Sequence, residues 1–368
     1  MDFSFTEEQE TVGKVARQLF EARATPDHLI ELEAGDVRYD PALWNELASS
    51  DLLGIALPED VGGSGGGFLE LGVLLSEVGW SVAPVPVYST LVLGADTIAR
   101  HGDSSLKQEY LPGVVDGSVI LTAALAEPGN FNPAAPRHTT ARRDGDRWII
   151  DGTKDMVPAA QLANAIVVSA VADDGPGLFV VDADSAGLVV TPVPSTDGQP
   201  YAEVTFAGAS ARRLHADGDI VGSLYTRALV GLCAVQVGVT ERALRIAASY
   251  TAEREQFGRP IGSFQAVQQR MADAFIDTEA IRWTTWHAAW LIAEGRPAGR
   301  EASIAKFWAA EAGARVVATA QQVHGGMGID VTYPVSRYYL WAKDIELALG
   351  SASQQLTRLG TAYSEGSK

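Results

Sequence analysis

The spacing of apolar residues changes twice along the chain and divides it into three stretches. Over residues 5–118 apolar residues recur every three or four positions, as at Val12, Val15 and Leu19. This is the period of amphipathic helices. A glycine-rich segment at 62–67 interrupts the pattern. We expect an N-terminal α-helical domain over residues 1–118.

Residues 119–214 have a different texture. Short apolar runs, such as 148–150 and 178–181, are bounded by Asp-Gly pairs, as at 144–145 and 174–175. Short runs separated by turn dipeptides are typical of hairpin-linked strands. We therefore expect a middle antiparallel β domain over 119–214.

Residues 215–368 return to the helical period in longer form. The stretches 263–294, with Phe275 and Ile281 on one stripe, and 300–324 each predict a long helix, and Ser263 is a candidate N-cap. Long neighbouring helices favour an up-and-down four-helix bundle. The predicted fold class is α+β: helices, a β domain, then a helical bundle.

Charge and composition narrow the function. The 368 residues carry a formal net charge of −18, which argues against nucleic-acid binding because that affinity comes from cationic side chains. The one cysteine, Cys233, lies in an apolar run and predicts a buried thiol. No histidine spacing indicates a metal site. No stretch of about 20 apolar residues predicts a membrane span, and residues 1–10 do not resemble a signal peptide, so we expect a cytoplasmic protein.

The segment Gly62 to Gly66 formally matches G-x-S-x-G, the nucleophile elbow of hydrolases. That elbow requires an apolar strand entering it, and residues 57–60 (Leu-Pro-Glu-Asp) do not supply one. A turn between helices is the better interpretation.

Two C-terminal segments carry candidate chemistry. In the first, Arg254 precedes a Phe257-Gly258 break, and a helix begins near Gln265. A guanidinium beside a helix N-terminus suits a diphosphate. In the second, 321–328, a helix opens into glycines that allow close approach to a flat ring. From the residues alone, phosphate binding and simple helix termination stay equally open.

These segments resemble the acyl-CoA dehydrogenase family, and the resemblance covers essentially the whole chain. The strongest motifs are R-x-x-F-G-x-x-I-x-x-x-Q at 254–265 and Q-x-x-G-G-x-G at 322–328. Weaker ones are residues 1–3 with 6–9, 57–63, 127–129 and 152–154. The resemblance implies a β-barrel as the middle domain and FAD as the cofactor.

In that family FAD lies across a subunit boundary. The resemblance implies that this chain offers a neighbouring subunit the diphosphate and adenine half of the site, through Arg254, Phe257, Gln265, Gln322, Gly325 and Gly326. The reaction it implies is α,β-dehydrogenation of an acyl-CoA thioester: a carboxylate takes the proton beside the carbonyl while a hydride passes to the flavin.

The expected catalytic glutamate is missing. The resemblance places it either in the loop after the glycine motif, where Thr332 stands, or on the first long C-terminal helix, where Ala228 stands. We therefore predict no catalytic residue in this chain, with Asp330 as the fallback base.

The flavin-facing half is altered too. By resemblance, residues 126–132 lack a hydroxyl and a Gly-Ser-Asp sequence, and residues 154–159 lack an aromatic neighbour for the flavin. Pro158 also removes a backbone N–H.

This pattern resembles the noncatalytic subunit of actinobacterial α2β2 acyl-CoA dehydrogenases, many of which act on steroid side-chain CoA esters. It implies a paralogous catalytic subunit as partner, an acyl-CoA substrate in the complex and an electron-transfer acceptor. Two alternatives stay open: a self-sufficient homotetramer that uses Asp330 as base, and a non-redox structural or acyl-CoA-binding member.

Overall fold

The computed structural model describes residues 4–35, 38–215 and 218–366. Met1 to Phe3, which carry part of the family resemblance, lie outside the described residues. The chain forms two compact units, and several helices run from one unit into the other. The first comprises residues 1–12, 35–71 and 84–228, and the second comprises 13–34, 72–83 and 229–368.

The N-terminal stretch is helical, as its apolar period predicts. Its helices begin where local chemistry allows: Asp40, for example, accepts hydrogen bonds from the N–H groups of Ala42 and Leu43 at the start of α3. The elements are α1 (Glu7–Arg23), α2 (Pro26–Glu33), α3 (Pro41–Ser49), the 3₁₀ turn η1 (Glu59–Val61), α4 (Phe68–Ser81), the π-helix η2 (Tyr88–Ala95), α5 (Asp96–His101) and α6 (Ser104–Val115).

The glycine-rich segment at 62–67 is a loop between η1 and α4. No strand enters it, so the prediction of a turn is confirmed and the geometry of a nucleophile elbow is absent from this described segment.

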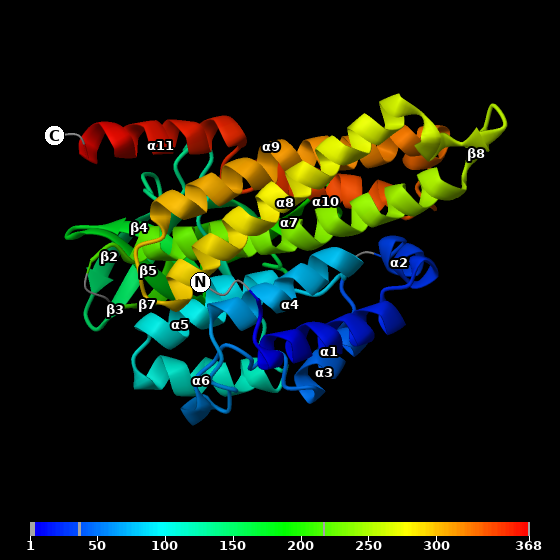
Figure 1. Cartoon of the computed structure of the whole chain (residues 1–368). Helices are drawn as coiled ribbons and strands as arrows, with labels where there is room; N and C mark the ends of the chain where they lie inside the picture. Colours follow the sequence, from blue (N-terminus) through cyan, green and yellow to red (C-terminus); the bar gives the residue numbers. More distant parts are fainter. Residues whose placement is uncertain (1–3, 36–37, 216–217, 367–368) are drawn as a thin grey trace. The chain divides into compact units, whose positions relative to one another are not determined.

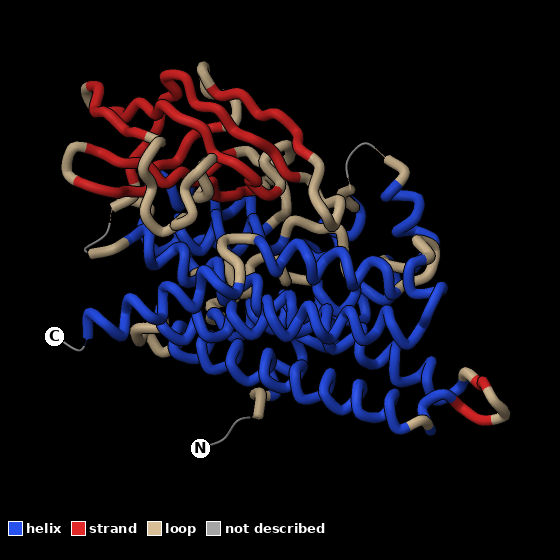
Figure 2. Tube along the Cα trace, turned by 90° about the horizontal axis from the view of Figure 1, so that it is seen from above, coloured by secondary structure: helices blue, strands red, loops and turns tan. Residues whose placement is uncertain are grey.

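The middle stretch forms a closed β-barrel. Strands β4, β2, β3, β7 and β5 follow one another around it, and β5 pairs back with β4. Strand β1 adds to β4 and β6 adds to β7. Figure 2 shows these strands as one body. Their bounds are β1 (Leu121–Ala124), β2 (Thr140–Asp144), β3 (Arg147–Pro158), β4 (Ala165–Ala172), β5 (Gly175–Asp182), β6 (Leu188–Val193) and β7 (Tyr201–Arg213).

The barrel is not wholly antiparallel as the sequence led us to expect. β1 pairs with β4 in parallel, from Leu121 beside Ala165 to Ala124 beside Val168, and β2 meets β4 in parallel at Thr140. Parallel pairing needs a long connection between the strands, and 40 residues, including β2 and β3, lie between β1 and β4. The turn dipeptides predict the antiparallel hairpins but not the parallel pairings.

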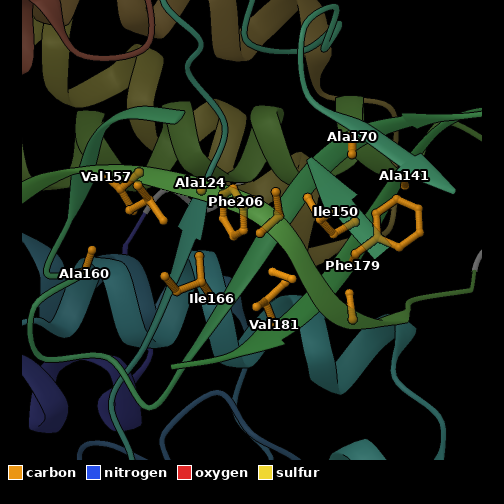
Figure 3. Close-up of a cluster of buried hydrophobic side chains, with 14 of the residues drawn as sticks. Ala124, Ala141, Ile150, Val157, Ala160, Ile166, Ala170, Phe179, Val181 and Phe206 are labelled. Carbon is orange, nitrogen blue, oxygen red and sulfur yellow. The ribbon is translucent and has the colours of Figure 1, made fainter. Parts of the chain in front are cut away.

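Side chains that point inward fill the barrel. Ile166, Val181 and Phe206 lie together there, and each is at most 2% exposed (Figure 3). Alternate residues of the strands supply this core, because successive side chains of a strand point to opposite faces.

The C-terminal stretch supplies the long helices (Figure 1). The predicted helices at 263–294 and 300–324 are α8 and α9. The elements are α7 (Ile220–Glu253), β8 (Glu255–Gln256), β9 (Arg259–Pro260), the 3₁₀ turn η3 (Ile261–Ser263), α8 (Gln265–Ala293), α9 (Gly299–His324), the 3₁₀ turn η4 (Gly325–Ile329), α10 (Val335–Leu347) and α11 (Ala352–Gly366).

Helix α7 is the core helix of this part. Among the described helices it is long and apolar enough to cross a membrane by length and composition, but 83% of its most apolar window is buried inside the protein. Cys233 is fully buried in it, as predicted, and burial raises the pKa of the thiol to about 12. The second unit's part of α7 touches α4 at glycine: a Cβ on Gly238 would lie 1.8 Å from the Ser76 carbonyl oxygen.

Candidate functional site

The end of α7 that leads into the first C-terminal motif lies against the second motif. Tyr250, near the end of α7, stacks on His324, the last residue of α9, with ring centroids 4.2 Å apart. The Tyr250 hydroxyl also lies 3.9 Å from the Met327 sulfur in η4. Thus 254–265 and 322–328 belong to one region. A surface hollow of about 620 Å³ adjoins this stack, lined in part by Tyr250, Glu253 and Tyr333.

A hairpin of β8 and β9 with a two-residue turn projects beyond the ends of α7 and α8 (Figures 1 and 2). Phe257 and Gly258 form its turn, with φ of 56° and 77°. Turns with two positive φ angles favour Asn and Gly, so Phe257 holds a conformation that a bulky residue rarely adopts. Its side chain is also 93% exposed. Phe257 meets Phe264 edge to face, with ring centroids 6.1 Å apart, but this contact leaves the Phe257 ring almost wholly exposed.

Three polar side chains of the motifs are exposed and make no hydrogen bond or ion pair with another described residue: Arg254, Gln265 and Gln322. The N-terminus of α8 beside them has no side-chain cap. The prediction that Ser263 caps this helix is wrong: Ser263 lies in η3 and donates its hydroxyl to the Pro260 carbonyl instead. The first amide groups of α8 therefore remain available to an anion.

The glycine loop is open on its outer side. A Cβ on Gly325 or Gly326 would meet no atom within 4 Å, whereas one on Gly328 would lie 2.5 Å from the Gln321 carbonyl oxygen. Gly325 also has a φ of 61°. Gly328 is thus explained by internal packing and Gly325 by its backbone. Neither packing nor a positive φ requires glycine at position 326, and the missing side chain leaves room for a group from outside the described chain.

The positions expected to hold the base carry no acid. Ala228 is fully buried in α7, and its carbonyl accepts a hydrogen bond from Tyr88. Thr332 is exposed and donates both its N–H, at 2.9 Å, and its hydroxyl, at 2.7 Å, to Asp330. These bonds lower the pKa of the exposed Asp330 carboxyl, which makes it a weaker proton acceptor. This geometry disfavours Asp330 as a base.

A second strained turn, between α10 and α11, was not anticipated from the sequence. Leu349 has a φ of 54°, and the buried Lys306 donates to the carbonyls of Glu346 and Gly350 on either side. Strained residues held by buried polar groups cluster at functional sites. The only local signal is a Leu-Gly pair after a helix.

In the segments expected to face a flavin, Glu127 and Lys154 are satisfied by internal bonds, whereas Met156 and Ala159 hold positive φ angles of 49° and 53°. The buried Glu127 carboxylate lies 3.1 Å from Lys154 Nζ and accepts from Asn130 and from the N–H groups of residues 137–139. Burial alone would raise the pKa of Glu127, but Lys154 and these bonds outweigh it and lower the pKa to about 2. Nearby, Phe131 is 80% exposed. The loop is built as a structural brace.

The fold and these motifs define the class of protein. Models of the N-terminal, middle and C-terminal domains of acyl-CoA dehydrogenases match residues 6–118, 122–209 and 225–363. The chain belongs to the acyl-CoA dehydrogenase family, whose members are FAD-dependent oxidoreductases. Our boundaries at 118/119 and 214/215 stay predictions.

Individual relatives show which members of the family the chain is similar to. The chain is 39% identical to acyl-CoA dehydrogenase FadE27 of Mycobacterium tuberculosis, with 99% of each chain covered. Among solved structures it is similar to a variant of the Tcur3481–Tcur3483 steroid ACAD (46% identity, TM-score 0.94, 98% and 99% covered) and to the ChsE4–ChsE5 complex of M. tuberculosis (39%, 0.95, 99% of each). Both similar structures are heteromeric.

Proposed function

We propose that this chain is the noncatalytic subunit of a cytoplasmic, heterotetrameric α2β2 acyl-CoA dehydrogenase that acts on an acyl-CoA thioester, such as a steroid side-chain CoA ester. One observation carries the proposal: Arg254, Gln265 and Gln322 are exposed, without partners in the described chain, and lie at one end of the bundle. A site whose parts face outward is completed by another subunit.

The residues fit half of an FAD site. Arg254 and the uncapped start of α8 suit a diphosphate, and Gly325 and Gly326 leave space for a flat ring system. Phe257 offers an aromatic face. FAD supplies the hydride acceptor when bound, and an electron-transfer partner reoxidises it. In our proposal this chain grips the nucleotide part, and the paralogous subunit provides the flavin-facing barrel and the glutamate.

The test is the FAD content of the complex co-expressed with a glutamate-bearing paralogue. Arg254→Met removes one charge-assisted contact, and we expect FAD affinity to fall at least about tenfold. Gly326→Val fills the open space and should lower FAD content without changing the melting temperature. The control, Arg300→Met, makes the same charge change at the opposite end of α9, roughly 36 Å from His324 along the helix. It also removes the ion pair of Arg300 with Glu301, so the melting temperature of this variant is measured beside its FAD content.

Two outcomes would overturn the proposal. One is FAD content that is unchanged in Arg254→Met and Gly326→Val, which would favour a structural role without redox function. The other is a yellow isolated chain that acyl-CoA reduces, which would favour the self-sufficient enzyme.

Variants that add a carboxylate to the isolated chain further distinguish a dependent subunit from a self-sufficient enzyme. We expect Thr332→Glu, Ala228→Glu and, at the strained turn, Leu349→Glu to give little activity, since the flavin-facing segment is also altered.

A further inference from the structure

A separate cavity of about 380 Å³ lies within the second unit. It is formed by the end of α1, the start of α2, the end of α4, the middle of α7 and the start of α10. Its walls are mostly apolar and aromatic, with two arginines, one glutamate and a serine among them. The lining residues are Glu21, Ala24, Thr25, Pro26, Leu29, Trp80, Ser81, Val82, Arg242, Ile246, Pro334, Arg337 and Tyr338.

Two polar atoms of these lining residues are buried and lack a hydrogen-bond partner: Ser81 Oγ and Arg337 Nη1. Ser81 is 8% exposed and Arg337 is 6% exposed. The other two nitrogens of Arg337, Nε and Nη2, bind Glu33 at 2.6 and 3.0 Å. One edge of the guanidinium is therefore satisfied and the remaining nitrogen is not, which native interiors rarely tolerate without an unseen partner.

A strained residue flanks the same wall. Val82 has a φ of 44°, a left-handed conformation that is unusual for a β-branched side chain. It ends α4 where a glycine is normally found. Strain of this kind is retained mainly where a site requires the geometry, and Val82 and Ser81 line the cavity side by side.

The charges around the cavity are balanced in number, but Arg242 is a lining cation that forms no ion pair with a described carboxylate, so it is the group that would attract an anion. The Arg242 guanidinium lies 5.1 Å from the centre of the Trp80 ring, and Arg337 adds a second positive charge that Glu33 offsets. Glu21 is the carboxylate among the described lining residues. An acceptor placed among Arg242, Arg337 Nη1 and Ser81 would fill the missing bonds, while Trp80 would contact an apolar body.

We propose that this cavity binds a small organic anion, a carboxylate or phosphate ester with an apolar or aromatic body, at a site separate from the nucleotide-binding end. The site involves neither Arg254 nor the hairpin, so it does not depend on the proposed function.

Calorimetric titration of the full chain tests this with four probes: phenylacetate, phenyl phosphate, inorganic phosphate and neutral 2-phenylethanol. We expect saturable binding of at least one anion below about 10 mM and much weaker binding of 2-phenylethanol. The stronger of phenylacetate and phenyl phosphate distinguishes a carboxylate from a phosphate ligand. Equal binding of the neutral probe, or no saturable anion binding, would overturn the proposal.

Variants locate the site. Ser81→Ala and Arg242→Met should each weaken anion binding about tenfold. Ser81→Ala should leave the melting temperature unchanged or raise it, because the hydroxyl makes no internal bond. The matched control is Arg245→Met, whose guanidinium also lies near Trp80, at 5.4 Å, but does not line the cavity. Equal losses in Arg242→Met and Arg245→Met would contradict a defined site, and a loss in Arg254→Met would assign the binding to the nucleotide-binding end.

Discussion

The buried pair Glu127–Lys154 offers a direct test of the claim that the altered flavin-facing loop is a brace. Both side chains are fully buried, and Glu127 also holds Asn130 and three backbone N–H groups. Lys154→Met leaves that carboxylate buried without its cation. Breaking a buried pair by removing one partner costs about 3–5 kcal/mol, which for a domain of this size lowers the melting temperature on the order of 10 °C.

The assay is calorimetric unfolding of the full chain at neutral pH, with limited proteolysis of residues 127–139 as a local probe. Lys154→Met/Glu127→Gln should recover about 1–3 kcal/mol of the loss, because the two residues interact directly. The control is Asp174→Asn, which breaks the exposed barrel pair Arg213–Asp174 and should move the melting temperature by no more than about 2 °C. A Lys154→Met effect no larger than that of the control would refute the brace.

Three further predictions concern stability and reactivity. Gly238→Ala should cost about 3 kcal/mol in chemical denaturation because its Cβ meets backbone, whereas Gly360→Ala, at an open position of α11, should stabilise by about 0.5–1 kcal/mol; equal effects would contradict the α4–α7 contact. Cys233, with its pKa near 12, should resist iodoacetamide at about pH 8 until urea unfolds the chain, and rapid native labelling would disprove its burial. Burial lowers the pKa of Lys306 from 10.5 to about 8, so the unfolded state holds the extra proton between these values and stability from this group rises with pH there. Lys306→Met should lose that rise in melting curves, and parallel curves would contradict it.

The sequence predicted elements well where one local signal was sufficient. The helical period placed α9 within a residue and α8 within two at its N-terminus. Ser263 failed as a cap because capping depends on the backbone that the preceding hairpin imposes, and a serine hydroxyl serves equally well as a donor to a carbonyl.

Longer-range features were not readable. The parallel pairing of β1 with β4 depends on which strands meet across the 40 residues that separate them, and apolar runs carry no direction. Likewise, the α8 stripe includes Ile281, which is fully buried, and Phe275, which is 57% exposed. The period identifies an apolar face but not what covers it.

For the site, sequence patterns located the two motifs but did not show how their side chains are bonded or how strained their backbone is. That Arg254 and Gln322 have no internal partner, or that Phe257 is strained, follows only from coordinates. Leu349 and the Ser81 cavity have no motif, because strain and unpaired atoms are properties of packing.

The hairpin tip also matters for how the protein is produced. A phenylalanine ring presented almost wholly to water at the end of an arm is apolar surface that the proposed companion subunit would cover. In the proposed assembly, subunits made in excess of the companion subunit would keep this ring exposed. Balanced synthesis of the two polypeptides would then matter for the yield of the complex.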